Sequence, residues 1–410
     1  MNAFLVLRKP NLRRLLTANL FSGIGDWFNS VAVLSLLMEL TGTAMAVGIT
    51  LALRTLPHLL FGPLGGMLAD RCDKKKVMVV CDFARAAIAL CFLLVSSAAD
   101  TWLVYCGTFL LVVFSSLYNP SRLSILPQIV KRDELAAANA LDESVYGVVM
   151  AVGSMIGGIF IALWGADVAF VFNSLSFVLS GVLISRLTVG LPEREERAET
   201  VAATSYRDVL TFVWKQPIVR PILLLTTLWP IGGGIVNVLI SVYAFQVFHA
   251  GDMGIGLLYG AIGLGFIAGG MAASRFTNRP YKIASASLAI EGFALLLTSF
   301  SPSIYVTALF YTLSTIAGGM GNASLRTLLM EHVPGHTQGR VFALEATVSN
   351  VLIGFSMLAG GWLLSFAPPR LTGFAAGACI TLLSIVFGLS LWRASRIAQT
   401  QTTRLLAKIE

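Results

Sequence analysis

Long apolar runs, separated by short polar or Gly/Pro-containing breaks, follow one another along the whole chain. Each run reaches about 20 mostly apolar residues, the length at which an α-helix crosses a bilayer. The runs cover residues 14–40, 44–69, 77–98, 101–121, 135–163, 168–188, 219–247, 253–275, 282–300, 304–325, 341–366 and 371–392. The pattern therefore predicts an all-α membrane protein with twelve transmembrane helices.

The longest polar interruption lies between residues 189 and 218. Its first part is dense in charge and indicates a solvated linker, whereas Tyr206 to Lys215 has the spacing of a short amphipathic helix at the membrane surface. Six predicted spans precede it and six follow. We therefore expect a six-helix bundle at 1–188, a cytoplasmic linker at 189–218, a second bundle at 219–393 and a cytoplasmic tail at 394–410.

Composition and charge agree with a membrane protein of defined orientation. Of the 410 residues, 56% are apolar and 12% charged, and the mean hydropathy is +0.80. If the N-terminus is cytoplasmic, all but two of the 29 basic residues lie in or next to cytoplasmic segments; Arg54 and Arg370 are the exceptions. This asymmetry follows the positive-inside rule and predicts that both termini are cytoplasmic. The net charge of +8 then reflects topology, and no nucleic-acid partner is expected.

Candidate chemistry for an enzyme is missing from the sequence. The five cysteines form no CxxC pair, and the chain has no metal-ligand spacing, nucleotide-binding loop or nucleophile elbow. We expect no disulfide, metal, cofactor or enzymatic activity. The first apolar run is long enough to remain as a helix and lacks a cleavage signature, so an uncleaved N-terminus is expected.

The two halves of the chain correspond at an offset of 203 residues. Asn119, Ser121, Ala140, Leu141, Gly157 and Gly158 are matched by Asn322, Ser324, Ala343, Leu344, Gly360 and Gly361. A duplicated six-helix unit explains this correspondence. Such internal repeats are typical of secondary transporters, in which two halves rock around a site near the membrane midplane.

The turn between the second and third runs carries the most specific motif. It contains Gly66, Asp70, Arg71, Asp73, Lys74 and Lys75. It resembles the turn between helices 2 and 3 of the major facilitator superfamily, with Asp73 in place of the second glycine. That departure, the run Gly25 to Phe28 and the Asn139-Ala140-Leu141 segment resemble the bacterial branch of macrolide and enterobactin exporters.

The resemblance implies that the charged turn gates the cytoplasmic side. Asp70 would contact the N-terminus of helix 11 near Gly339 and Arg340, where a helix dipole favours a carboxylate. The residues assigned to gating are Gly66, Asp70, Arg71, Lys74, Lys75, Asp82, Arg85 and Arg340. The alternatives are that Asp70, Arg71 and Lys74 to Lys76 only set topology and that Asp82 and Arg85, three residues apart, form a structural pair.

Ionisable residues at membrane depth are candidates for ion coupling, because each is costly there unless paired or hydrated. Asp26 lies near the middle of helix 1, His58 lies at similar depth in helix 2, and Arg54 lies about one turn further out. In the coupling hypothesis, Asp26 takes up a proton in one conformation and is ionised against Arg54 in the other. The alternative is a permanent ion pair that joins helices 1 and 2. Glu291 is a second proton site or hydrogen-bonds to Ser287.

Polar and aromatic residues within the spans suggest a pocket for an amphipathic molecule. The candidates are Phe28, Asn29, Trp229, Asn237, Tyr243 and Asn350. Small residues allow helices to approach closely, and those expected to do so are Gly153, Gly157, Gly158, Gly360 and Gly361.

The sequence thus predicts a monomeric efflux transporter of the bacterial inner membrane. It would export a small amphipathic compound, as in multidrug resistance, by alternating access and antiport with protons. Two alternatives share the fold: a siderophore exporter and a flippase for membrane lipids or lysolipids. A third, of another class, is a membrane sensor or assembly factor that transports nothing.

Overall fold

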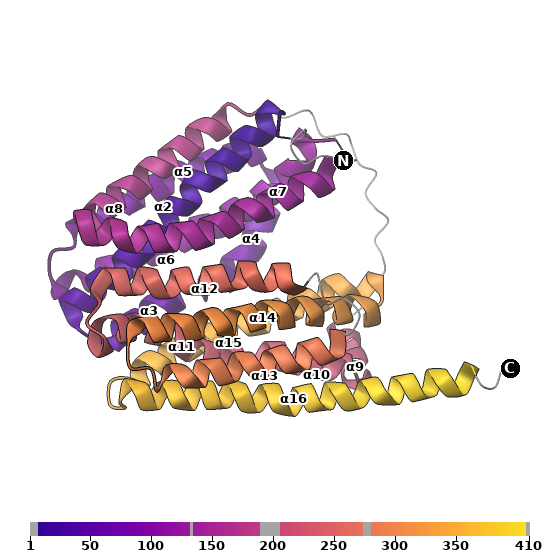
Figure 1. The fold of residues 1–410 in the computed structure, drawn as a ribbon. Helices are drawn as coiled ribbons and strands as arrows, with labels where there is room; N and C mark the ends of the chain where they lie inside the picture. The colour runs from indigo at the N-terminus through magenta and orange to yellow at the C-terminus, as the bar shows by residue number, and fades with distance from the viewer. Residues whose placement is uncertain (1–6, 132–133, 189–205, 274–279, 407–410) are drawn as a thin grey trace. The chain divides into compact units, whose positions relative to one another are not determined.

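The computed structural model describes residues 7–131, 134–188, 206–273 and 280–406, and its regular structure there is helical. The first part of the chain forms α2 (Pro10–Thr41), α3 (Ala44–Leu53), α4 (Pro57–Arg71), α5 (Lys74–Cys91), α6 (Thr101–Ile129), α7 (Leu135–Val148) and α8 (Ser154–Ser185) (Figure 1). The second part forms α9 (Tyr206–Lys215), α10 (Val219–Leu228), α11 (Pro230–Val242), α12 (Gly251–Ala273), α13 (Pro280–Thr298), α14 (Ile304–His332), α15 (Gly335–Leu363) and α16 (Pro369–Leu406). Two π-helical segments, η4 (Val149–Gly153) and η5 (Tyr243–Val247), continue α7 and α11.

Eleven helical stretches of the described chain are long and apolar enough to cross a membrane. One of them, α8, contains a break at Gly165, whose φ of 83° and ψ of 167° are not helical. The chain turns back on itself there, as Figure 1 shows, so α8 contains the end of one span and the whole of the next. A positive φ is accessible to glycine without steric cost. Divided at Gly165, the described helices agree with the twelve predicted spans.

The second predicted span, 44–69, is one membrane-spanning stretch, Ala44–Ala69, with a turn near its middle. Helix α3 ends at Leu53 and α4 begins at Pro57, which leaves Arg54 on the short turn between them. The backbone of Arg54 stays in the right-handed helical region, and its N–H still donates to the carbonyl of Thr50. Proline has no N–H, so one hydrogen bond of the helix is missing at Pro57. Arg54 therefore lies within the span, at membrane depth.

Local side-chain chemistry fixes the turn between α4 and α5. The Asp73 carboxylate accepts hydrogen bonds from the backbone N–H groups of Lys75 and Lys76, at 3.0 and 3.3 Å. It is therefore the N-cap of α5, a position that Asp favours strongly. This explains how an aspartate can stand where the resembled motif has glycine.

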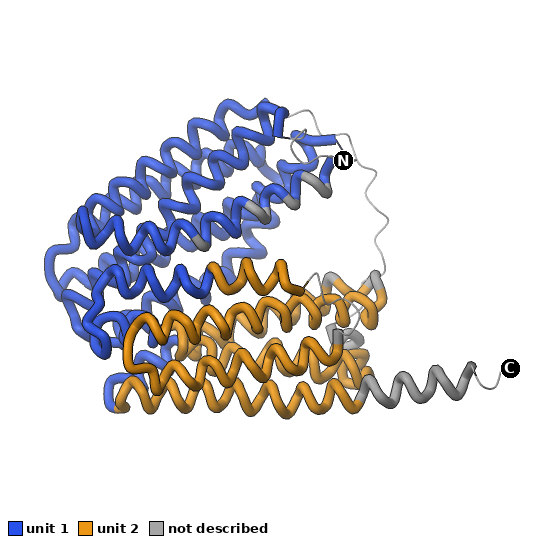
Figure 2. The backbone as a smooth tube through the Cα atoms, in the orientation of Figure 1, with its two compact units in different colours: residues 1–196, 238–263, 357–366 blue, residues 197–237, 264–356, 367–410 orange. Residues whose placement is uncertain are grey.

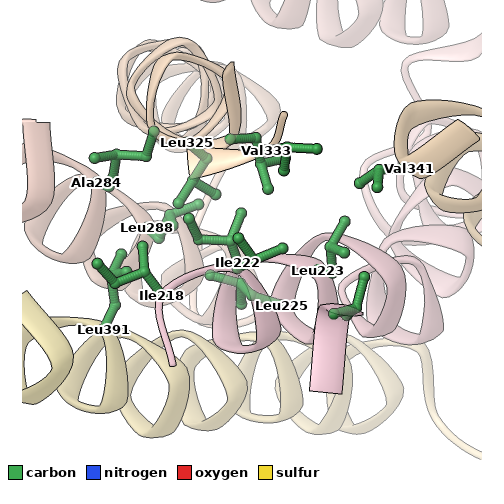
Figure 3. Packing of buried hydrophobic residues seen from close by; sticks show 14 residues of the cluster. Ile218, Ile222, Leu223, Leu225, Ala284, Leu288, Leu325, Val333, Val341 and Leu391 are labelled. Carbon is green, nitrogen blue, oxygen red and sulfur yellow. The ribbon is translucent and has the colours of Figure 1, made fainter. Parts of the chain in front are cut away.

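The helices form two compact units (Figure 2). Unit 1 comprises residues 1–196, 238–263 and 357–366, and unit 2 comprises residues 197–237, 264–356 and 367–410. Each has its own apolar core. In unit 2, side chains of α10, α13, α14 and α16 converge around Ile222 and Leu288 (Figure 3), and in unit 1 a second cluster surrounds Leu12 and Ile125.

Glycines bring helices of unit 1 into backbone contact. A Cβ atom added at Gly158 of α8 would lie 2.6 Å from the Cα of Gly256 in α12. One added at Gly48 of α3 would lie 3.1 Å from the Cα of Gly361 in α15. Small residues permit such close packing in membrane helices. Gly158 and Gly361, two of the glycines predicted to pack, therefore lie at helix contacts of unit 1.

Candidate functional site

One face of α2 carries four polar residues and one valine that line cavities. Asn19, Ser22, Asp26, Asn29 and Val33 follow one another at intervals of three and four residues, so they lie on one side of the helix. At 1.5 Å per residue this face is about 21 Å long. It lines two cavities of unit 1, and Asp26 belongs to both.

The larger cavity has a volume of about 490 Å³. It extends along α2 from Trp27 toward the N-terminal end of the helix. Its charged lining residues are Asp26, Arg85, Arg122 and Asp142. Arg122 Nη1 donates a 2.5 Å hydrogen bond to Asp142 Oδ2, so these two charges compensate each other at that end of the cavity.

The smaller cavity, of about 160 Å³, extends from Asp26 in the opposite direction along α2. Arg54 and His58 line it, together with Asn29 and Thr108. The structure thus gathers three of the four residues predicted for coupling, Asp26, Arg54 and His58, around one cavity. It also places Asn29 there, a residue predicted to contact substrate.

Asp26 and Ser115 mark the junction of the two cavities, because both residues line each of them. Within the described residues, no hydrogen bond or ion pair engages the Asp26 carboxylate. Two cations share a cavity lining with it: Arg85 in the larger cavity and Arg54 in the smaller one. The permanent ion pair with Arg54 considered from the sequence is therefore not formed in this conformation.

Arg85 forms a buried ion pair with Asp82 on α5. Asp82 Oδ2 also accepts a 2.8 Å hydrogen bond from Ser180 Oγ of α8. The guanidinium lies between the rings of Tyr118 and Phe177, at 4.5 and 4.4 Å from their centroids. Such cation–π contacts stabilise a desolvated arginine. The pair predicted from the spacing thus exists, and its cation faces the larger cavity.

His58 is held by Ser116 of α6. The distance between His58 Nδ1 and Ser116 Oγ is 2.7 Å, and Ser116 Oγ lies 2.8 Å from the carbonyl oxygen of Val112. A hydroxyl donates one hydrogen, and a carbonyl can only accept. Both contacts are satisfied when the hydroxyl donates to Val112 and His58 Nδ1 donates to the hydroxyl, which leaves Nε2 as the proton-accepting nitrogen of His58.

The π-helical segment η4, which joins α7 to α8, contacts α2 on both sides of Asp26. A Cβ atom added at Gly23 would lie 2.7 Å from Val149 Cγ1, and one added at Gly153 would lie 3.0 Å from Trp27 Cβ. Trp27 also contacts the ring of Tyr259 edge-on, at a centroid distance of 5.5 Å. The irregular segment therefore packs against the turn of α2 that carries the junction carboxylate.

Most residues predicted to contact substrate lie elsewhere. Phe28 is 3% exposed and packs against the rings of Phe160 and Phe172, at 4.9 and 5.0 Å, so it lines neither cavity. Tyr243 is 1% exposed within η5. Trp229 and Asn237 are partly buried and Asn350 is exposed, and all three belong to unit 2.

Glu291 is 3% exposed in α13, and its Oε2 has no hydrogen-bond partner among the described residues. The hydrogen bond to Ser287 considered from the sequence is not formed there. Its carboxylate packs on Gly318 of α14. Glu291 belongs to unit 2 and Asp26 belongs to unit 1, so the two predicted proton sites lie in different units.

The residues predicted to gate are described only in part. Arg71 is exposed, Lys74 and Lys75 are partly buried, and Lys75 Nζ donates to the carbonyl of Leu187 at 2.9 Å. Gly66 has open space around it. Arg340 Nη1 is buried without a partner in the described chain. The side chain of Asp70 and the surroundings of Gly339 fall outside the described residues.

Sequence reasoning missed the contribution of α6. Thr108, Ser115, Asn119 and Arg122 line the two cavities at spacings of seven, four and three residues. These spacings place all four on one face of a helix. The spacing of these four polar residues is visible in the sequence. That they face α2 across the cavities is known only from the structure.

Comparison with known proteins agrees with this architecture. The Major Facilitator Superfamily profile matches residues 15–350 and 223–405. Macrolide efflux protein A of Streptococcus pyogenes is 20% identical over 337 residues, with 80% of this chain and 83% of that protein covered. The uncharacterized MFS-type transporter YfiS of Bacillus subtilis (strain 168) is 23% identical, with 92% of each chain covered.

Solved structures show the same fold. A bacterial homologue of the iron transporter ferroportin, solved in an inward-facing state, superimposes with a TM-score of 0.73 at 16% identity, covering 92% of this chain and 98% of that one. The peptide transporter PepTSo of the POT family superimposes with a TM-score of 0.70 at 13% identity, covering 95% of this chain and 99% of that one. With twelve spans and a family profile that extends over both halves, the chain is a multi-pass membrane transporter that belongs to the Major Facilitator Superfamily.

Proposed function

We propose that this chain is an exporter of the bacterial inner membrane, with both termini cytoplasmic, that expels a small amphipathic compound in exchange for protons. The similarity to macrolide efflux protein A supports export. The distribution of basic residues supports the orientation. Protons are the proposed counter-substrate because of Asp26.

The observation that carries the proposal is the position of Asp26 at the junction of two cavities. A carboxylate at membrane depth is costly and commonly marks an ion pathway. Here it has no ion-pair partner within the described residues, and each cavity has room for water. A proton can therefore reach the carboxylate, and its charge can be compensated differently in different conformations.

Alternating access couples to protons only if the two conformations differ in proton affinity. Asp26 meets this requirement when protonation removes its attraction to the cations of unit 1. The protonated transporter then favours one conformation and the ionised transporter the other. Substrate leaves in one direction while the proton travels in the other.

The test measures transport by the full chain in proteoliposomes with and without an imposed pH gradient. The probes are a macrolide, a catecholate siderophore and a fluorescent phospholipid. We expect gradient-driven macrolide movement, and Asp26→Asn to abolish the effect of the gradient. The control is Asp167→Asn, which removes an exposed carboxylate outside both cavities.

Gradient-driven transport that persists unchanged in Asp26→Asn refutes the role of Asp26. If only the siderophore or only the phospholipid moves, the proposed substrate class is wrong and the corresponding alternative, a siderophore exporter or a lipid flippase, takes its place. If none of the probes moves and none releases protons, the sensor or assembly-factor alternative is favoured over transport.

A further inference from the structure

A second charged group besides Asp26 lies beside the junction of the two cavities. Arg85 Nη1 lies 3.5 Å from Ser115 Oγ, and Ser115 is the α6 residue that lines both cavities. Arg85 itself lines the larger cavity together with Asp26. The carboxylate of α2 and the hydroxyl of α6 thus mark the junction, and the guanidinium of α5 lies next to the hydroxyl.

The two cations near Asp26 are held very differently. Arg54 lies on the turn between α3 and α4, and no hydrogen bond or ion pair of its guanidinium is found in the described chain. Arg85 is 4% exposed and is fixed by Asp82 and by the rings of Tyr118 and Phe177. A fixed charge stabilises an anion without reorganising at each cycle, which is the basis of electrostatic preorganisation.

The Arg85 guanidinium also retains donor capacity. An arginine has five N–H donors. Asp82 engages Nη2 and Ser115 lies beside Nη1, while Nε is buried without a partner among the described residues. Arg85 and Asp26 line the same cavity. The arginine is therefore not saturated by Asp82.

We propose that Arg85 is a positioning residue for the coupling reaction: its fixed charge at the junction stabilises Asp26 in the ionised form and so sets the pH at which Asp26 binds its proton. The proposal rests on the proposed function, because it assigns a regulator to the same carboxylate. It gives Arg85 a role beyond the cytoplasmic gate to which the sequence assigned it. Asp82, Ser180 and the two rings hold Arg85 in place.

Several other titratable groups face Asp26 across the cavities. Arg54 and His58 come from the second span, Tyr118 and Arg122 from α6, and Asp142 from α7. Tyr259 of α12 contacts the ring of Trp27, which lines the larger cavity. In the described part of the chain, α8 and η4 add no charged side chain to either cavity lining. Arg122 is paired with Asp142, so its pair is the natural control.

The experiment observes protonation directly and requires no substrate. Infrared difference spectra of the full chain in liposomes are recorded as a function of pH, and the carboxylic C=O band lost in Asp26→Asn identifies Asp26. Removing both members of the buried pair, in Asp82→Asn with Arg85→Gln, avoids leaving one charge buried alone. We expect half-protonation of Asp26 in this double variant at a proton concentration about tenfold lower than in the unaltered chain.

Two further variants control for structural effects. Arg85→Lys keeps the charge and should keep half-protonation close to that of the unaltered chain. Arg122→Gln with Asp142→Asn removes the other pair of the same cavity and should produce a clearly smaller change. A double Asp82/Arg85 variant that titrates like the unaltered chain would overturn the proposal, and so would an equal change on removing the Arg122 pair.

The outcomes separate this proposal from the proposed function. If no titrating band disappears in Asp26→Asn, then Asp26 is not the proton site and the proposed function fails. If the band exists but does not respond to Arg85, then only the role of Arg85 fails.

Discussion

The backbone contact between Gly158 and Gly256 predicts that a single methyl group will open one end of unit 1. In Gly158→Ala, the new Cβ would lie 2.6 Å from Gly256 Cα, 2.8 Å from the Asp252 carbonyl oxygen and 3.0 Å from Gly256 N. Carbon atoms prefer a separation of at least about 3.5 Å, so α8 and α12 must move apart by about 1 Å. All three obstructing atoms belong to the backbone, and no side chain can rotate away.

The magnitude follows from the cost of overpacking, about 1–3 kcal/mol. Alanine also favours the helix over glycine by about 1 kcal/mol, but that gain is present whether or not α8 and α12 touch. Only the packed conformation is penalised. A penalty of about 2 kcal/mol lowers the ratio of packed to separated molecules about 30-fold.

The assay is a distance distribution between spin labels at Leu163 and Met253, two exposed positions near the packed ends of α8 and α12, in a chain whose five cysteines have been replaced. We expect Gly158→Ala to move population toward longer distances. Gly62→Ala is the matched control, because a Cβ added there meets no atom within 4 Å. Equal distributions for the unaltered chain and Gly158→Ala would refute the reasoning.

Two further predictions concern stability. Asp73→Ala removes the side-chain cap of α5 and should lower the free energy of unfolding by about 1 kcal/mol. Asp73→Asn keeps an oxygen that can accept the same hydrogen bonds and should retain most of the stabilisation. Thermal unfolding in detergent measures both variants, and equal losses would contradict the capping role. Glu134 accepts hydrogen bonds from the Lys9 ammonium and from the Lys131 backbone N–H. The bond from Lys9 contributes most, and the two together hold the pKa of Glu134 below its usual value of 4.5. The Glu134 carboxylate therefore binds a proton more weakly in the folded protein than in the unfolded chain. Its contribution to the free energy of unfolding is complete above the usual pKa and is lost as the pH falls through the lowered pKa of the folded protein. The difference in melting temperature between the unaltered chain and Glu134→Gln should therefore be present near neutral pH and vanish in acid, and a difference independent of pH would contradict the assignment.

The fold was largely predictable because each spanning helix carries its own signal. Apolar runs of sufficient length located the spans, and Asp73 and Pro57 mark helix ends that local chemistry alone explains. The span 44–69 was predicted with its bounds, and only the turn at Arg54 was not anticipated, although Pro57 three residues later removes one helical hydrogen bond. The predicted boundaries of 101–121 were too short because polar residues at the end of α6 line a cavity, so the helix continues to Ile129.

The site was predictable only where the relevant geometry lies within one helix. The spacing of Asp82 and Arg85 predicted their ion pair, and the depth of Asp26 and Arg54 predicted a common location. Whether Arg85 faces Asp26 depends on how α5 is rotated against α2, and no local pattern encodes that rotation. The same reason explains Phe28, whose neighbours Phe160 and Phe172 come from α8.

The π-helical segment η4 makes the span formed by α7 and the start of α8 adjustable beside Asp26. A π turn contains one residue more than an α turn, and such segments occur frequently at functional sites. Rewinding Val149–Gly153 into α form would absorb that residue by sliding the adjoining helix about 1.5 Å along its axis and rotating it by about 100°. Val149 would then leave Gly23, so a change of winding in one helix would be transmitted as a change of packing around the acid in another.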